Sequence, residues 1–161
     1  MITGAAHTFF DSPVGRLKLV ASAEALVAIL WPNDRPARVP LLATVEDPAH
    51  PLLVQTTREL QEYFARRRTS FEVPLAFIGT AFQKEVWRQL LAIPYGETRT
   101  YSQIAHALGN PTAVRAVGAA NGRNPISILA PCHRVVGANG QLTGFAGGLE
   151  AKAKLLALER A

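Results

Sequence analysis

The chain has 161 residues, 48% of them hydrophobic and 18% charged, which excludes a disordered protein and allows one domain or two small ones. It contains no run of about 18 uncharged apolar residues, so no membrane span is expected. The opening "MITGAAHTFFDSPVG" lacks a signal-peptide pattern, so secretion is not expected. The net charge of +5 favours a polyanionic partner such as nucleic acid.

The first half of the chain predicts β-strands and one helix. Three β-prone runs come first, at 7–10, 16–21 and 25–31. A proline-rich loop follows, and then an apolar stripe at helical spacing, formed by Leu53, Thr57, Leu60 and Phe64. Residues 70–75 predict one more strand, with Pro74 indicating a sheet edge. We therefore expect a small N-terminal α/β supporting domain, an antiparallel sheet plus a helix, over residues 1–77.

The second half, residues 78–161, predicts mostly helices. Thr80 can cap a helix over 81–92. Thr100 and Gln103 match a capping box that opens a helix over 101–108, and Gly109 stands where a terminating glycine belongs. Two short helices joined by a tight turn are typical of a helix-turn-helix.

The second helix of that pair is predicted over 111–121, with Asn110 as N-cap and Pro111 at the first position. A turn at Asn139-Gly140 and a last helix over 149–160 complete the chain. The expected fold class is α+β, with a winged helix-turn-helix-like C-terminal domain that binds DNA.

The 111–121 helix has an unusual composition for a DNA-reading element. It offers alanines, Gly118 and a single long side chain, Arg115, instead of several base-reading side chains. Close helix packing in a core is one interpretation. The other is close approach to a narrow groove, with Arg115 entering the base stack.

Cys132 is the only cysteine, so an internal disulfide and a multi-cysteine zinc site are excluded, and the four histidines show no ligand spacing. We expect no metal and a reducing, cytoplasmic location. A lone cysteine is usually buried and inert, but His133 and Arg134 can favour a thiolate here. In an extended segment Cys132 and His133 would point apart, so a bridging water with His133 as base, oriented by a carboxylate, would solve the geometry. Glu159 is a candidate for that carboxylate, although the pattern alone favours an ordinary exposed charge at a helix end.

Two further polar residues allow either a structural or a functional interpretation. Asn124 is either a turn residue or a brace for the backbone that leads to Cys132. Tyr101 is either part of a helix's first turn or a side chain that presses on a phosphate or sugar.

The segments around the cysteine resemble a known family. "PCHRV", preceded by "RAVGAANGRNPI" and followed by "GFAGGLEAKAKLLALE", is similar to the O6-alkylguanine-DNA alkyltransferases, the methylated-DNA–protein-cysteine methyltransferases. The match runs from "FQKEVW" to Glu159. The first half resembles the family's variable N-terminal domain in its order of elements, without the cysteines that some relatives use for zinc.

The resemblance implies direct, stoichiometric DNA repair in which Cys132 accepts the alkyl group of O6-alkylguanine in duplex DNA, with activity on O4-alkylthymine left open. His133 would deprotonate the thiol through water, Glu159 would orient His133, and Asn124 would brace the site. Arg115 would replace the flipped guanine, from a helix lying in the minor groove. Tyr101 would help to rotate the nucleotide out, and Ser102 and Asn110 are further DNA-binding candidates.

The resemblance also implies a guanine pocket formed by Val135, Phe145, Gly147 and Gly148. Phe145 stands where many relatives have tyrosine, so any role of that hydroxyl is in doubt here. A thioether has no easy leaving group, so the protein should act once. No diffusible methyl donor or other cofactor is expected, because no nucleotide-binding glycine fingerprint is present. We expect a monomer that can bind DNA cooperatively.

Three other functions compete with this interpretation. A non-catalytic helix-turn-helix regulator explains the charge but leaves the cysteine motif without a role. A cysteine hydrolase leaves the alanine-rich helix unexplained. The alkyltransferase-like proteins lack the acceptor that Cys132 provides.

Overall fold

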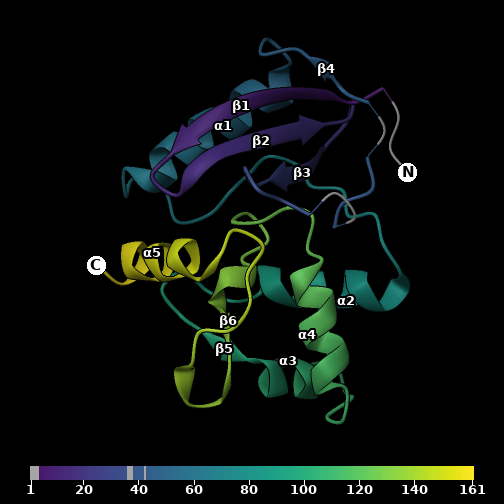
Figure 1. Ribbon diagram of the computed structural model, residues 1–161, viewed down its shortest axis with the longest axis vertical. Helices are drawn as coiled ribbons and strands as arrows, with labels where there is room; N and C mark the ends of the chain where they lie inside the picture. The colour runs from purple at the N-terminus through teal and green to yellow at the C-terminus, as the bar shows by residue number, and fades with distance from the viewer. Residues whose placement is uncertain (1–3, 36–37, 42) are drawn as a thin grey trace.

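The computed structural model describes residues 4–35, 38–41 and 43–161. Figure 1 shows a curved sheet with helix α1 against one face and a group of short helices beneath the sheet. The sheet and α1 come from the first half of the chain, and the helices come from the second. This is the α+β arrangement that the sequence predicts.

The sheet has four strands in the order β3-β2-β1-β4. Their bounds are Ala6–Ser12 (β1), Gly15–Ala21 (β2), Leu26–Leu30 (β3) and Val45–Glu46 (β4). The β1–β2 and β2–β3 pairs are antiparallel, whereas the two-residue β4 lies parallel to β1. The three predicted strands are confirmed. The exposed β4 was not predicted, because two residues carry no periodicity.

Helix α1, Pro51–Phe64, is also confirmed, but its buried face differs slightly from the predicted stripe. Leu53 and Leu60 are buried as expected, and they are joined by Thr56, Glu59 and Tyr63 instead of Thr57 and Phe64. Both sets satisfy helical spacing, and packing selects between them. The selected face turns Tyr63 toward the second half of the chain.

The predicted strand over 70–75 is wrong. Only Leu75 bridges to Leu26, at the edge of the sheet. The backbone N–H groups of Glu72 and Val73 donate to the buried carboxylate of Glu59, at 2.9 and 3.2 Å, and not to a neighbouring strand. Pro74 has no N–H to donate, so the ladder stops there.

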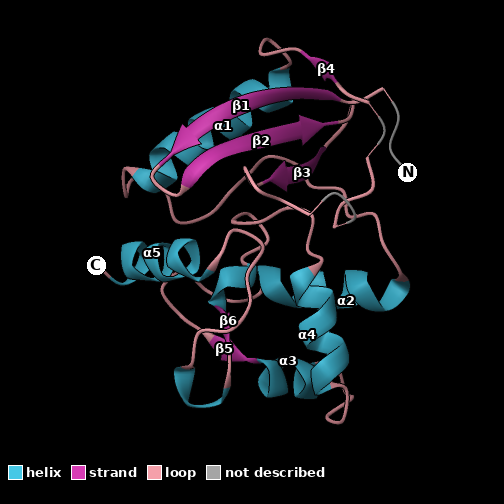
Figure 2. Cartoon of the chain, viewed as in Figure 1, coloured by secondary structure: helices cyan, strands magenta, loops and turns pink. Residues whose placement is uncertain are grey.

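The second half contains α2 (Ala81–Leu91), α3 (Tyr101–Ala107), α4 (Val114–Gly122) and α5 (Leu149–Arg160), as Figure 2 shows. Thr80 and Thr100 both complete capping boxes, with Gln83 and Gln103. The strands in this part are a parallel two-residue pair, β5 (Arg99–Thr100) and β6 (Val135–Val136).

Helix α4 begins later than predicted. Its N-cap is Ala113, without a side-chain cap. The carbonyl of Asn110 accepts the N–H of Ala113 at 3.0 Å, which closes a separate turn over the expected first helical residues. Gly109 ends the preceding segment at a φ of 74°, as expected. The two helices still form a helix-turn-helix pair.

The backbone from residue 126 to Cys132 is not extended, contrary to expectation. The N–H of Ala130 donates to the carbonyl of Ile126 at 2.9 Å, and Ile128 has a φ of 76°. The cysteine then opens a single 3₁₀ turn, η1 (Cys132–Arg134). A second turn, η2 (Ala138–Gly140), holds Asn139 and Gly140 at positive φ, as the predicted Asn-Gly turn requires.

One apolar core joins the two halves. Leu17 and Leu19 of the sheet and Leu53 and Leu60 of α1 belong to the same buried cluster as Ile126, Ile128, Leu129 and Leu155 from the second half. The N–H of Ile29 in β3 also donates to the carbonyl of Pro125 at 2.8 Å. The sheet therefore packs directly on the segment that leads to Cys132. None of the helices in the described ranges is long and apolar enough to span a bilayer.

Candidate active site

Cys132 lies at the start of η1, only 3% exposed, between the helices and the sheet domain. Burial raises the pKa of the thiol. Hydrogen bonds from Asn124 and Ser127 and the nearby charges of Arg38 and Lys152 act in the opposite direction. The thiol is thus inaccessible to bulk solvent but surrounded by groups that stabilise a thiolate.

His133 and Glu159 form a buried pair next to this thiol. His133 Nε2 lies 2.7 Å from Glu159 Oε2, and both side chains are at most 1% exposed. Arg134 adds Nε to Oε1 at 2.8 Å and Nη2 to Oε2 at 3.1 Å. Burial alone would raise the pKa of Glu159, but the bonds from His133 and Arg134 outweigh it and lower the pKa to about 2. Glu159 is therefore an acceptor at neutral pH.

This arrangement fixes the tautomer of His133. Burial, together with the charges of Arg134 and Lys152, lowers the pKa of His133 despite the opposing effect of Glu159, so the ring is neutral at neutral pH. An ionised Glu159 must receive the proton on Nε2, which leaves Nδ1 as an acceptor. Nδ1 is buried and has no partner among the described protein atoms. The imidazole of His133, the residue that follows Cys132, therefore has a free lone pair on Nδ1.

The depressed pKa of Glu159 predicts loss of stability in acid. In the unfolded chain this group titrates near 4.5, and in the folded protein at about 2. The unfolded state takes up the proton first, so stability that is present above about pH 4.5 is lost as the pH falls toward 2. The difference amounts to roughly 3 kcal/mol. Urea unfolding of the wild-type protein and of Glu159→Gln at pH 7 and pH 3 tests this. If both proteins lost the same free energy of unfolding between pH 7 and pH 3, the prediction would be contradicted.

Asn124 holds the backbone beneath the thiol. Its Nδ2 donates to the carbonyl of Ala130 at 2.8 Å, and its Oδ1 accepts the N–H of Ile126 at 3.0 Å. These bonds straddle Ile128, a buried β-branched residue in the left-handed region, which costs about 1–3 kcal/mol. Asn124 is itself 1% exposed, and its own carbonyl accepts from Arg38 of the first domain.

A loop over 141–148 is held in place by side chains of α3 and α5. Lys152 Nζ, buried in α5, donates to the carbonyls of Val135 at 2.6 Å and Thr143 at 3.2 Å. The hydroxyls of Thr143 and Tyr101 are 2.6 Å apart. Lys152 and Tyr101 therefore fix this loop against β6 and α3. Gly148 follows at a φ of 91° and caps α5.

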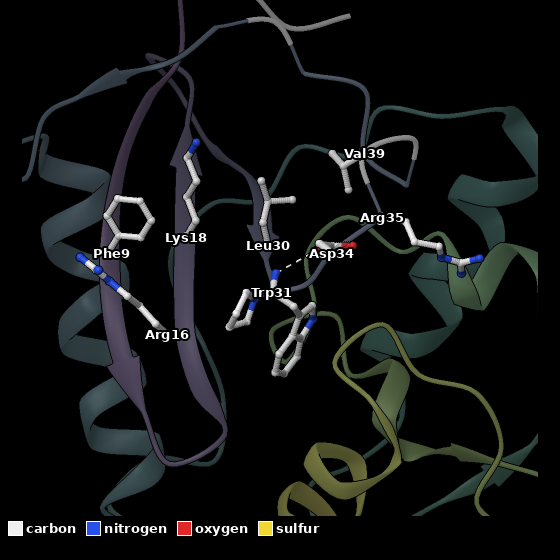
Figure 3. Close-up of a pocket in the computed structure, with 9 residues that line it drawn as sticks. Phe9, Arg16, Lys18, Leu30, Trp31, Asp34, Arg35 and Val39 are labelled. Carbon is white, nitrogen blue, oxygen red and sulfur yellow. Dashed lines mark hydrogen bonds between the residues drawn. The ribbon is translucent and has the colours of Figure 1, made fainter.

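Trp31 of the first domain packs under the same loop. Its ring centroid is 5.3 Å from that of Phe145, edge to face, and its Nε1 donates to Ser127 Oγ at 3.1 Å. Figure 3 shows the indole at the end of β3, pointing away from the sheet toward the second half of the chain. Trp31 thereby contacts both the loop and Ser127, whose side chain lowers the pKa of the thiol.

Gly147 packs so closely on Trp31 that a side chain cannot fit. A Cβ at this position would lie 2.6 Å from Trp31 Cε3. We expect Gly147→Ala to lower the free energy of unfolding by about 1–3 kcal/mol, because the indole is held by its own contacts. Gly144→Ala is the matched control in the same loop, since no atom lies within 4 Å of its Cβ. Urea denaturation compares the two, and equal stabilities would contradict the tight contact.

The residues expected to contact DNA lie on α3, on α4 and in the turn between them. Arg115, Ser102 and Asn110 are exposed, and Tyr101 is half-buried. A Cβ on Gly118 would lie 3.9 Å from Tyr101, an ordinary contact, so protein packing does not demand glycine there. Cys132, in contrast, is buried.

Two hollows in the structure are not lined by the thiol. One of about 320 Å³ lies on the sheet domain, between Phe9, Lys18 and Leu30 (Figure 3). The other, of about 360 Å³, is lined by Arg35, Arg38, Gly118, Ala119, Gly122 and Arg123. Because Cys132 lines neither hollow, neither is assigned as the alkyl-acceptor pocket.

Sequence reasoning missed several groups around the site, namely Trp31, Arg38, Tyr63, Ser127 and Lys152. Lys152 had a usable indication, since it stands seven positions before Glu159 on α5 and both occupy the buried face. Tyr63 and Trp31 had none, because their contacts join residues 96 apart or more from different domains.

The chain combines a helix-turn-helix with a buried thiol and a His–Glu pair. These features define a class of protein that combines nucleic-acid binding with covalent chemistry on one cysteine. Comparison with known proteins identifies which class this is. Residues 6–77 match the family model described as the 6-O-methylguanine DNA methyltransferase ribonuclease-like domain, and residues 81–161 match the DNA binding domain of the same enzyme.

The similar proteins cover nearly the whole chain. A methylated-DNA–protein-cysteine methyltransferase of Methanosarcina acetivorans is 48% identical over 95% of this chain and 97% of its own length. The constitutive enzyme of that name from Bacillus subtilis is 46% identical over 96% and 94%. The crystal structure of Mycobacterium tuberculosis OGT in complex with DNA superposes with a TM-score of 0.89 at 43% identity, over 96% and 92%. The chain belongs to the 6-O-methylguanine DNA methyltransferase family.

Proposed function

We propose that this protein repairs DNA by moving the alkyl group from O6 of an alkylated guanine in duplex DNA to Sγ of Cys132, once per molecule. The observation that carries the proposal is the buried thiol beside a neutral His133, whose Nδ1 is free and whose Nε2 is held by Glu159. The relatives from Methanosarcina acetivorans, Mycobacterium leprae and Bacillus subtilis are named methylated-DNA–protein-cysteine methyltransferases, which supports it.

The chemistry balances without a co-reactant. The thiol proton passes through a bridging water to Nδ1 of His133, and Glu159 stabilises the imidazolium that forms. The thiolate attacks the alkyl carbon, a C–S bond forms, and the C–O6 bond breaks. Its electron pair stays on the guanine, which takes up one proton, so none is lost or gained overall. The thioether cannot be resolved by a second cysteine, since the chain has none.

Access to Cys132 requires the damaged nucleotide to leave the base stack, at a cost of a few kcal/mol. Helix α4 lies in the minor groove, where its alanines and Gly118 allow close approach. Arg115 fills the space that the guanine leaves, and Tyr101 presses on the target phosphate. Ser102 and Asn110, both exposed, add contacts to the backbone.

The extruded guanine enters between Val135 and the 141–148 loop. Phe145 stacks on the base, and the backbone of Val135, Gly147 and Gly148 lines the pocket. Asn124 braces the turn that carries Cys132, as its two backbone bonds support. A non-catalytic helix-turn-helix regulator would leave this buried constellation without a role.

Residues 1–77 form the supporting domain, and residues 78–161 form the DNA-binding and alkyl-acceptor domain. We place the protein in the cytoplasm, as a monomer that binds DNA cooperatively.

A titration tests the single turnover: a fixed amount of duplex with O6-methylguanine is mixed with increasing protein, and restored guanine is counted. Equal moles of guanine and protein are expected, whereas several guanines per protein would overturn the proposal.

A further inference from the structure

The first domain reaches into the buried pair through Tyr63. The Tyr63 hydroxyl, at the end of α1, donates to Glu159 Oε2 at 2.6 Å. Tyr63 is fully buried, and its ring packs among Phe64, Phe71 and Tyr95, with centroids 5.1 to 6.3 Å away. Burial and the charge of Glu159 raise the pKa of Tyr63, so the phenol keeps its proton and can act toward this carboxylate only as a donor.

Tyr63 and His133 bind the same oxygen. Glu159 Oε2 takes the Tyr63 hydroxyl at 2.6 Å and lies 2.7 Å from His133 Nε2. A donor on that oxygen withdraws negative charge from it and weakens its hold on the imidazole proton. The hydroxyl also fixes the direction of the carboxylate, because the aromatic cluster holds the ring in place.

We propose that Tyr63 is a positioning residue for the reaction: it orients Glu159 and sets how strongly His133 holds a proton. The inference rests on the proposed function, in which His133 takes the thiol proton. It gives the first domain a part in the chemistry beyond supporting the second.

Other ionisable groups face the pair and stay constant when Tyr63 is changed. These are Arg134 from η1, Lys152 from α5 and Tyr95 from the loop after α2. Arg134 and Lys152 are cations that oppose protonation of His133, and Glu159 favours it. Losing the Tyr63 hydroxyl leaves more charge on Oε2, so His133 should bind its proton more tightly.

Tyr63→Phe removes the hydroxyl and keeps the ring. We expect the His133 imidazole to titrate roughly 0.5 to 1 pH unit higher, the shift of one charge-assisted hydrogen bond. The acid limb of the pH–rate profile for Cys132 alkylation by free O6-benzylguanine should move upward by the same amount. NMR of the imidazole measures the first quantity, and single-turnover kinetics from pH 5 to 9 measure the second.

Tyr95→Phe is the matched control. It removes a hydroxyl from the same aromatic cluster, and that hydroxyl has no hydrogen bond within the described ranges of the chain. Its profile should equal that of the wild-type protein. A second variant, with 3,5-difluorotyrosine at position 63 alone, keeps the donor and makes it more acidic, so the His133 titration should shift downward.

Unchanged His133 titration in both Tyr63 variants would overturn the inference, as would a Tyr63→Phe rate that falls equally at every pH. The NMR titration does not depend on alkyl transfer. If wild-type protein forms no adduct on Cys132, the proposed function fails while the titration still decides the role of Tyr63.

Discussion

Replacing Glu159 with glutamine should slow alkylation of Cys132 by about 100-fold or more, the scale of a lost general-base arrangement. The amide cannot stabilise the imidazolium at His133, and it can turn its N–H toward Nε2 and reverse the tautomer. The same change leaves the buried Arg134 without a counter-charge, which should lower the free energy of unfolding by about 3–5 kcal/mol. Single-turnover kinetics with O6-benzylguanine and urea denaturation measure the two effects.

Glu62→Gln provides the control for Glu159→Gln. Glu62 pairs with Arg68 at 2.8 Å, but its side chain is 32% exposed. A pair of this kind contributes about 0–1 kcal/mol, so stability and rate should stay close to wild type. If Glu159→Gln reacted as fast as Glu62→Gln, His133 would not need its carboxylate, and the base assignment would be wrong.

Arg115→Ala should separate DNA chemistry from thiol chemistry. Arg115 is exposed on α4, whereas Cys132 is buried, so the loss of Arg115 should leave reaction with free O6-benzylguanine unchanged. On duplex O6-methylguanine the rate should fall by roughly 10- to 100-fold. Extruding the base costs a few kcal/mol, and the variant lacks the side chain that would replace the guanine in the stack. Parallel rate measurements on the two substrates test this.

Arg58→Ala controls for the loss of one positive charge, since Arg58 is exposed on α1 in the sheet domain. It should retain most of the duplex rate. Equal losses on the free base and the duplex in Arg115→Ala would remove the finger role from Arg115, because a defect common to both substrates lies in the thiol site.

Local patterns in the sequence predict most of the fold. The capping boxes at Thr80 and Thr100 and the Asn139-Gly140 turn act over a few residues, and all three form. A prediction from local pattern fails where contacts with residues distant in the sequence determine the structure. The 70–75 segment gives two of its N–H groups to Glu59 of α1. The late start of α4 has a local cause instead, because Asn110 closes a turn with Ala113.

The residues of the site likewise fall into those that local sequence predicts and those that it does not. Cys132, His133 and Glu159 could be selected from the motif, and the structure brings the last two within 2.7 Å. The compact turn around Ile128 could not be predicted, because a β-branched residue at positive φ is stable only where Asn124 and the packed sheet hold it. Tyr63 and Trp31 could not be predicted either, since only tertiary packing brings the first domain to the thiol.

The central claim is that Cys132 itself receives the alkyl group. The direct measurement is intact-mass spectrometry of the protein after incubation with duplex DNA containing O6-methylguanine, followed by peptide mapping. We predict a mass increase of one methyl group per protein, located on Cys132, with guanine restored in the DNA. Repaired DNA with unmodified protein, or a methyl group on another residue, would contradict the account.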